Sequence, residues 1–76
     1  MTHQLSRAGI RAEVAELLYL APDEVPPGEN LFALGLDSVG LIGLVERWRA
    51  AGARVSFVEL AERPTLAEWW ELLAGG

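Results

Sequence analysis

The 76-residue chain contains no cysteine and no lysine, and its single histidine is His3. Without cysteine the protein has no disulfide framework and no thiolate nucleophile. No apolar run approaches the roughly 18 residues of a membrane-spanning helix, and the first residues lack the apolar core of a signal peptide. We therefore expect a cytoplasmic protein that has no membrane partner.

Basic residues are also scarce, because six arginines stand against eleven acidic residues and give a net charge of −5. Nucleic acids and anionic membranes require a basic protein face, so neither is expected as a partner. The charge is unevenly spread. Residues 1–37 hold two arginines against six acids, residues 38–52 two against one, and residues 53–76 two against four. Only the middle segment is not acidic.

The apolar content is sufficient for one small folded domain over residues 1–76, since 51% of the chain is hydrophobic and three residues are tryptophan. Apolar residues at helical spacing predict an all-α bundle of three main helices and one short helix. The stripes expected to face the core are Ile10, Val14, Leu17 and Leu18, then Leu41, Leu44, Val45 and Trp48, and finally Leu66, Trp69, Trp70 and Leu73.

Start and stop signals set the expected bounds of these helices, which run from about 4 to 20, 38 to 51, 57 to 62, and from 66 onward. The first two should end at a proline and a glycine, and the last two should begin with capping boxes. These signals are Pro22, Gly52, the pair Ser56 and Glu59, the pair Thr65 and Glu68, and the exit glycine Gly75.

A long connection over residues 21–37 joins the first two helices. Loops of this length are uncommon in compact domains and are usually functional or pinned to the core. Leu31, Phe32 and Leu34 are the expected pins, in a single helical turn after Asn30. In the following helix Gly40 and Gly43 each cost about 1 kcal/mol relative to alanine. They should therefore have tertiary support, or mark the close approach of another surface.

Ser38 stands at the expected start of the second helix, directly after Asp37. A hydrolytic serine needs a base within hydrogen-bond reach, and the only histidine is far away at the N-terminus. The nucleophile-elbow pattern G-x-S-x-G fails because Leu36 occupies its first glycine position. A single histidine without cysteine or a clustered second ligand gives no metal site. We expect neither a catalytic residue nor a metal.

Two other roles for Ser38 remain open on local sequence alone. Asp37 or Ser38 could cap the helix. Alternatively, another enzyme modifies Ser38, because the free N–H groups and dipole of a helix N-terminus favour an attached phosphate. Val39 and Ile42 flank the serine and lie off the core stripe, which suggests a surface for a partner.

The sequence "LGLDSV" resembles the phosphopantetheine attachment motif of carrier proteins in nonribosomal peptide and polyketide synthesis, and the resemblance covers essentially the whole chain. Together with "RWR", "RPTL" and the double tryptophan, the chain looks most like the aryl carrier proteins of siderophore synthesis. The resemblance implies that Ser38, with Asp37 as its motif neighbour, receives a 4′-phosphopantetheine arm from coenzyme A. The arm would hold a salicylate-like or dihydroxybenzoate-like acid as a thioester.

The same resemblance implies the partners: a Mg²⁺-dependent phosphopantetheinyl transferase, an adenylating aryl-acid ligase and a condensation domain. By position they would dock on Val39 and Ile42, and on Phe57 and Ala61 of the short helix, although Phe57 could equally belong to the core. A non-catalytic, free-standing monomer is expected.

Two alternatives differ in cargo and in class. A peptidyl or acyl carrier for a non-aryl cargo is the nearer one, because the loading enzyme chooses the cargo. An unmodified helical interaction module is the more distant one. Fatty-acid carriers present an acidic recognition helix, whereas residues 38–52 carry a net +1. That difference favours hydrophobic docking of the nonribosomal type.

Overall fold

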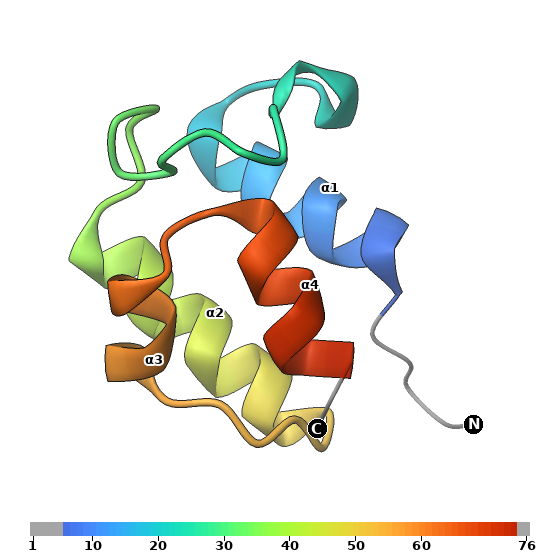
Figure 1. The fold of residues 1–76 in the computed structure, drawn as a ribbon, viewed down its shortest axis with the longest axis vertical. Coiled ribbons are helices and arrows are strands. Elements are labelled where there is room, and N and C mark those ends of the chain that lie inside the picture. The colour runs from blue at the N-terminus through green and yellow to red at the C-terminus, as the bar shows by residue number, and fades with distance from the viewer. Residues whose placement is uncertain (1–5, 75–76) are drawn as a thin grey trace.

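The computed structural model describes residues 6–74 and, within them, an all-α bundle without strands. Its elements are α1 (Arg7–Leu18), the short 3₁₀ helix η1 (Pro22–Glu24), α2 (Ser38–Ala50), α3 (Phe57–Glu62) and α4 (Leu66–Ala74). Three main helices and one short helix were predicted, and this architecture is confirmed. Figure 1 shows the long connection crossing one end of the bundle and α3 lying beside α2. The predicted helical residues 4 and 5, His3 and the exit at Gly75 lie outside the described residues.

The end of α1 corrects the sequence prediction that Pro22 stops the helix. The helix ends at Leu18, because Tyr19 adopts the left-handed conformation with φ 58°. The Tyr19 N–H then donates to the Glu16 carbonyl at 3.3 Å, and the Leu20 N–H to the Ala15 carbonyl at 3.0 Å. These two bonds form a Schellman motif, which usually has glycine at this position. Pro22 instead begins η1.

The core of the bundle is centred on two tryptophans from α2 and α4. Trp48 and Trp69 are fully buried, and their rings meet edge to face with centroids 5.8 Å apart and planes at 76°. Each buried indole N–H has an acceptor, since Trp48 Nε1 donates to Glu13 Oε1 at 2.8 Å and Trp69 Nε1 to the Leu60 carbonyl at 3.0 Å. Their polar atoms are therefore satisfied inside the core.

Two residues predicted for the core are partly exposed. Leu17 is 38% exposed, because it lies at the edge of the α1 stripe, and Ala15 is buried in its place. Trp70 packs against the core while keeping part of its ring at the surface. Its indole N–H donates to the Arg7 carbonyl at 3.1 Å, and the Arg7 guanidinium lies 5.3 Å from the ring centroid. The other ten stripe residues are buried as predicted.

The connection between α1 and α2 is held against the bundle at several points. Leu31 is fully buried, and Phe32 and Leu34 are half-buried. The sequence pattern did not reveal Val25, which is fully buried, or Leu36, which is 5% exposed. The predicted turn after Asn30 is confirmed by hydrogen bonds from following N–H groups to its side chain and carbonyl.

Side chains and backbone from other elements also hold this loop. Arg11 donates to the Pro22 and Val25 carbonyls, and the Leu31 N–H donates to the Pro64 carbonyl at 2.8 Å. The loop thus has a defined path into α2.

The remaining helix ends follow their sequence signals closely. α2 ends one residue earlier than predicted, at Ala50, and Gly52 has φ 105°. α3 has the predicted bounds and a full capping box between Ser56 and Glu59. At α4 the Thr65 hydroxyl accepts from the Glu68 N–H at 3.3 Å, but the Glu68 carboxylate accepts from that hydroxyl instead of the Thr65 N–H.

Candidate functional site

The start of α2 is a tight corner that places Ser38 as the first helical residue. Gly35 has φ 120°, a conformation that favours glycine, and lets the loop turn. Asp37 is extended, and its Oδ1 accepts the Gly40 N–H at 2.8 Å. Its carbonyl accepts the Leu41 N–H at 3.0 Å. Asp37 is therefore the N-cap, which settles one of the alternatives that the sequence left open.

Ser38 itself has no capping duty. Its side chain is exposed, and among residues 6–74 its hydroxyl makes no hydrogen bond. The free N–H groups of the first turn and the positive end of the helix dipole lie beside it. The corner therefore presents a free hydroxyl in surroundings that suit an attached phosphate.

Gly40 allows the start of α2 to lie close against the end of α1. A Cβ atom there would stand 3.3 Å from the Asp37 carboxylate, 3.3 Å from a Leu36 methyl and 3.4 Å from a Leu17 methyl. The sequence expected tertiary support for this glycine, and the structure provides it. Gly43 differs, because a Cβ atom there would meet no atom of the described residues within 4 Å, and the residue is exposed.

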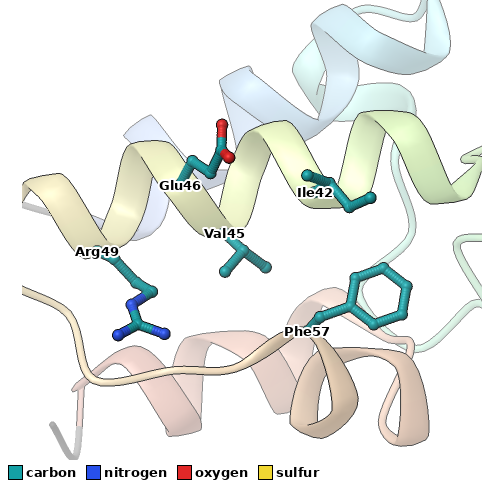
Figure 2. A pocket seen from close by; sticks show the side chains of 5 residues that line it. All are labelled: Ile42, Val45, Glu46, Arg49 and Phe57. Carbon is teal, nitrogen blue, oxygen red and sulfur yellow. The ribbon is translucent and has the colours of Figure 1, made fainter.

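The four predicted docking residues fall into two groups. Val39 and Ile42 on α2 are 78% and 48% exposed, whereas Phe57 and Ala61 on α3 are half-buried and pack against the core. Ile42 and Phe57 share an open pocket of about 440 Å³ with Val45, Glu46 and Arg49. In Figure 2 the Ile42 and Phe57 side chains face each other at one end, and Arg49 lies at the other. Ala61 does not line this pocket.

Arginines on α2 differ in their partners. Arg47 Nη1 lies 3.0 Å from Glu13 Oε2, which also connects α2 to α1. Because the arginine side chain is 55% exposed, this ion pair adds little to stability. Arg49 instead lines the pocket with Glu46. The face of α2 near Ser38 is therefore apolar, with mixed charge only at its far end.

Residues 6–74 contain no cluster of three His, Cys, Asp or Glu side chains that could hold a metal ion. None of the helices in this range is long and apolar enough to cross a membrane. The group at the start of α2 that is accessible for a reaction is the Ser38 hydroxyl.

The described residues thus form a small helical bundle with the Ser38 hydroxyl exposed at the start of α2. The sequence matches the family described as "Phosphopantetheine attachment site" over residues 8–73. The chain therefore belongs to this family, whose members are non-catalytic carriers with a covalent 4′-phosphopantetheine group. Such carrier domains work together with synthetase partners.

Among curated proteins, the acyl carrier protein ScoB of Streptomyces coeruleorubidus is 50% identical over 74 residues, which cover 97% of this chain and 87% of ScoB. An isochorismatase of Bacillus subtilis is 55% identical over 84% of this chain. The phenyloxazoline synthase MbtB of Mycolicibacterium paratuberculosis is 47% identical over the whole chain. The chain spans only 20% and 7% of the last two proteins. No solved structure matched significantly.

Proposed function

We propose that Ser38 is the attachment residue and that residues 1–76 form one aryl carrier domain. The observation that carries this proposal is that Asp37, and not Ser38, caps the start of α2. Asp37 caps α2 through its 2.8 Å bond to the Gly40 N–H, and this leaves the neighbouring hydroxyl of Ser38 exposed and unpartnered among the described residues. The match to the attachment family over residues 8–73 supports the same residue, because Asp37 and Ser38 lie within that range.

The attachment step needs an outside enzyme and coenzyme A. Ser38 Oγ forms a bond to the phosphorus that carries the pantetheine arm. The bond from that phosphorus to 3′,5′-adenosine diphosphate breaks, and the hydroxyl proton passes to a base of the transferase. The N-terminal N–H groups of α2 favour the negative phosphodiester that results. Once attached, the arm supplies a terminal thiol that holds an acyl group as a thioester.

An aryl acid is the cargo that we propose, with an adenylating ligase and a condensation domain as the loading and receiving partners. Two observations support it: the resemblance of "RWR" and "RPTL" to aryl carriers, and the relationship to a protein named phenyloxazoline synthase, whose named product contains a phenyl ring. The exposed Val39 and Ile42, and the Ile42–Phe57 pocket, form the apolar docking face, and Ala61 extends it along α3. We place this monomeric carrier in the cytoplasm.

An acyl carrier with a non-aryl cargo is the second candidate, because ScoB is named an acyl carrier protein and matches over nearly its full length. One experiment tests both the site and the cargo. The purified chain and Ser38→Ala are incubated with a promiscuous transferase, coenzyme A and Mg²⁺, and intact masses are measured. We expect one phosphopantetheinyl group on the wild type and none on the variant.

The modified protein is then incubated with the adenylating ligase and a series of aryl and aliphatic acids. Preferential thioester formation with aryl acids supports the aryl carrier, and preferential aliphatic loading would favour the second candidate. A wild-type chain that stays unmodified would instead point to an unmodified interaction module.

A further inference from the structure

Tyr19 combines a strained backbone with a fully presented side chain. Its φ of 58° is a genuine outlier for a bulky residue, and glycine would adopt the same conformation without strain. The side chain is 95% exposed, so core packing does not compensate for the strain. The two hydrogen bonds of the Schellman motif hold this strained conformation, and strained residues cluster at functional sites.

Tyr19 lies on a pocket that adjoins Ser38 on its α1 side. This pocket has a volume of about 280 Å³. It is lined by Leu17 of α1 and the following Tyr19, by the loop residues Gly35, Leu36 and Asp37, and by Val39 and Gly40 of α2. The Ile42–Phe57 pocket instead lies between α2 and α3. The two pockets share no residue, and only the first is lined by the two neighbours of Ser38 in the sequence, Asp37 and Val39.

Exposed apolar surface is concentrated at the α1-side pocket. Among the described residues, five large hydrophobic side chains are exposed, and three of them, Leu17, Tyr19 and Val39, line this pocket. Tyrosine is enriched among the residues that carry most of the binding energy in protein interfaces. This clustering around one concavity is typical of a surface that a partner covers.

The charge of the pocket identifies the chemistry of that partner. Among residues 6–74, Asp37 is the only acidic side chain that lines the pocket, and no arginine lines it. Glu16 is also exposed, one helical turn before Tyr19. A complementary surface is therefore apolar and basic. A protein that holds coenzyme A must supply cations for its phosphate groups, and it meets this requirement beside the reacting phosphorus.

The short distance over which the arm is transferred also favours a partner that holds coenzyme A. To transfer the arm, an enzyme must bring the phosphorus within about 3–3.5 Å of the Ser38 oxygen. Its surface then necessarily covers the residues next to Ser38, and Asp37, Val39 and Gly40 all line the pocket. Enzymes that act on the distal thiol of the arm have no such requirement.

We propose that Tyr19, together with Leu17 and Val39, forms the seat of the phosphopantetheinyl transferase, with the Tyr19 ring as its anchor. This inference rests on the proposed attachment at Ser38. The seat lies on the α1 side of the serine and shares only Val39 with the docking face of the aryl ligase and condensation domain, whose other residues lie along α2 and α3.

The test is the kinetics of arm transfer to Tyr19→Gly, with Tyr19→Phe and Val58→Ala as controls. Glycine removes the ring but suits the left-handed conformation, so the melting temperature should stay level or rise. For transfer we expect kcat/KM to fall about thirtyfold, the lower limit for an interface hot spot, mainly through a higher KM. Tyr19→Phe keeps the ring, and Val58 is an exposed hydrophobic side chain on α3 that lines neither pocket, so both should match the wild type.

Further variants and assays distinguish the possible outcomes. Tyr19→Asn also tolerates the left-handed conformation and should behave like Tyr19→Gly. Wild-type transfer kinetics in both variants would overturn the seat, whereas a wild-type chain that is never modified would overturn the proposed function instead. Prolonged incubation should still convert Tyr19→Gly fully, and the modified variant should accept its aryl acid at the wild-type rate. Slow loading after normal transfer would assign the surface to the ligase and refute the proposal.

Discussion

Asp37 and Ser38 are adjacent, yet the structure gives them separate tasks, and substituting each in turn should separate stability from modification. In Asp37→Ala the Gly40 N–H loses its 2.8 Å acceptor at the start of α2. Removal of such a cap costs about 1 kcal/mol, within a range of roughly 0.5–2. For a domain of this size, about 1 kcal/mol lowers the melting temperature by roughly 4–8 °C. Asp37→Asn should remain close to wild type, because asparagine caps equally well.

Ser38→Ala should have almost no effect on stability. The hydroxyl has no hydrogen-bond partner among residues 6–74, and the side chain is exposed. Surface changes of this kind usually stay within about 0.5 kcal/mol. The same variant should accept no arm. Asp37→Asn should still be modified, because it keeps both the cap and the serine.

Thermal and urea unfolding followed by circular dichroism would measure stability, and intact mass after incubation with transferase and coenzyme A would measure modification. The decisive comparison is between the two alanine variants. If Ser38→Ala destabilised the domain as much as Asp37→Ala, the hydroxyl would be part of the cap. The assignment of separate tasks would then be wrong, whatever the mass spectra showed.

Three further predictions concern α2. Trp48→Ala should lose roughly 3–5 kcal/mol by urea unfolding, because the ring is fully buried; a loss under about 1 kcal/mol would contradict its core role. Gly43→Ala should stabilise the domain by up to about 1 kcal/mol, since nothing in the described range lies within 4 Å of the added methyl, whereas Gly40→Ala should gain nothing because its methyl meets three neighbours at 3.3–3.4 Å. Equal effects at the two glycines would refute this distinction. Ile42→Asp should still be modified but transfer its cargo poorly to a condensation partner, and normal transfer would remove Ile42 from the docking face.

Periodicity and capping chemistry predicted most of the fold. α3 has the predicted bounds of 57–62, and α2 differs from its prediction by one residue. These signals are local and chemically specific, since a hydroxyl followed three residues later by glutamate has few other uses. The turn after Asn30 was predictable for the same reason.

The end of α1 could not be predicted in this way. A Schellman end normally has glycine at the left-handed position, and here the sequence has Tyr19, so Pro22 looked like the nearest stop. Tyr19 is thus both the strained residue and the proposed docking residue that the sequence pattern did not reveal. The clue available from sequence was that Tyr19 lies outside the apolar stripe of Ile10 and Val14, although such surface aromatics are common enough that the clue alone decides nothing.

The cap at α2 was ambiguous for a different reason. Asp37 and Ser38 are both good N-cap residues, and only the extended backbone of Asp37 shows which one caps. Trp70 was assigned to the core because an apolar stripe shows which face of a helix points to the core, but not how deeply each residue on that face is buried. Its ring lies at the edge of the bundle, under the Arg7 guanidinium.

The presence of two separate pockets along α2 agrees with what a carrier must do. Such a protein binds several enzymes in turn, and it must leave each one quickly. Small interfaces with few anchors give weak, transient complexes, and most of the tuning of affinity is in the rate of release. One broad apolar face would bind every partner at the same place. Separate pockets, one beside Tyr19 and one between Ile42 and Phe57, let the enzyme that modifies the serine and those that use the arm be distinguished by surface. Tyr19→Gly should therefore slow attachment of the arm, and Ile42→Asp should slow transfer of the cargo to the condensation partner. In each of these two assays the double variant should be no slower than the single variant that impairs that step.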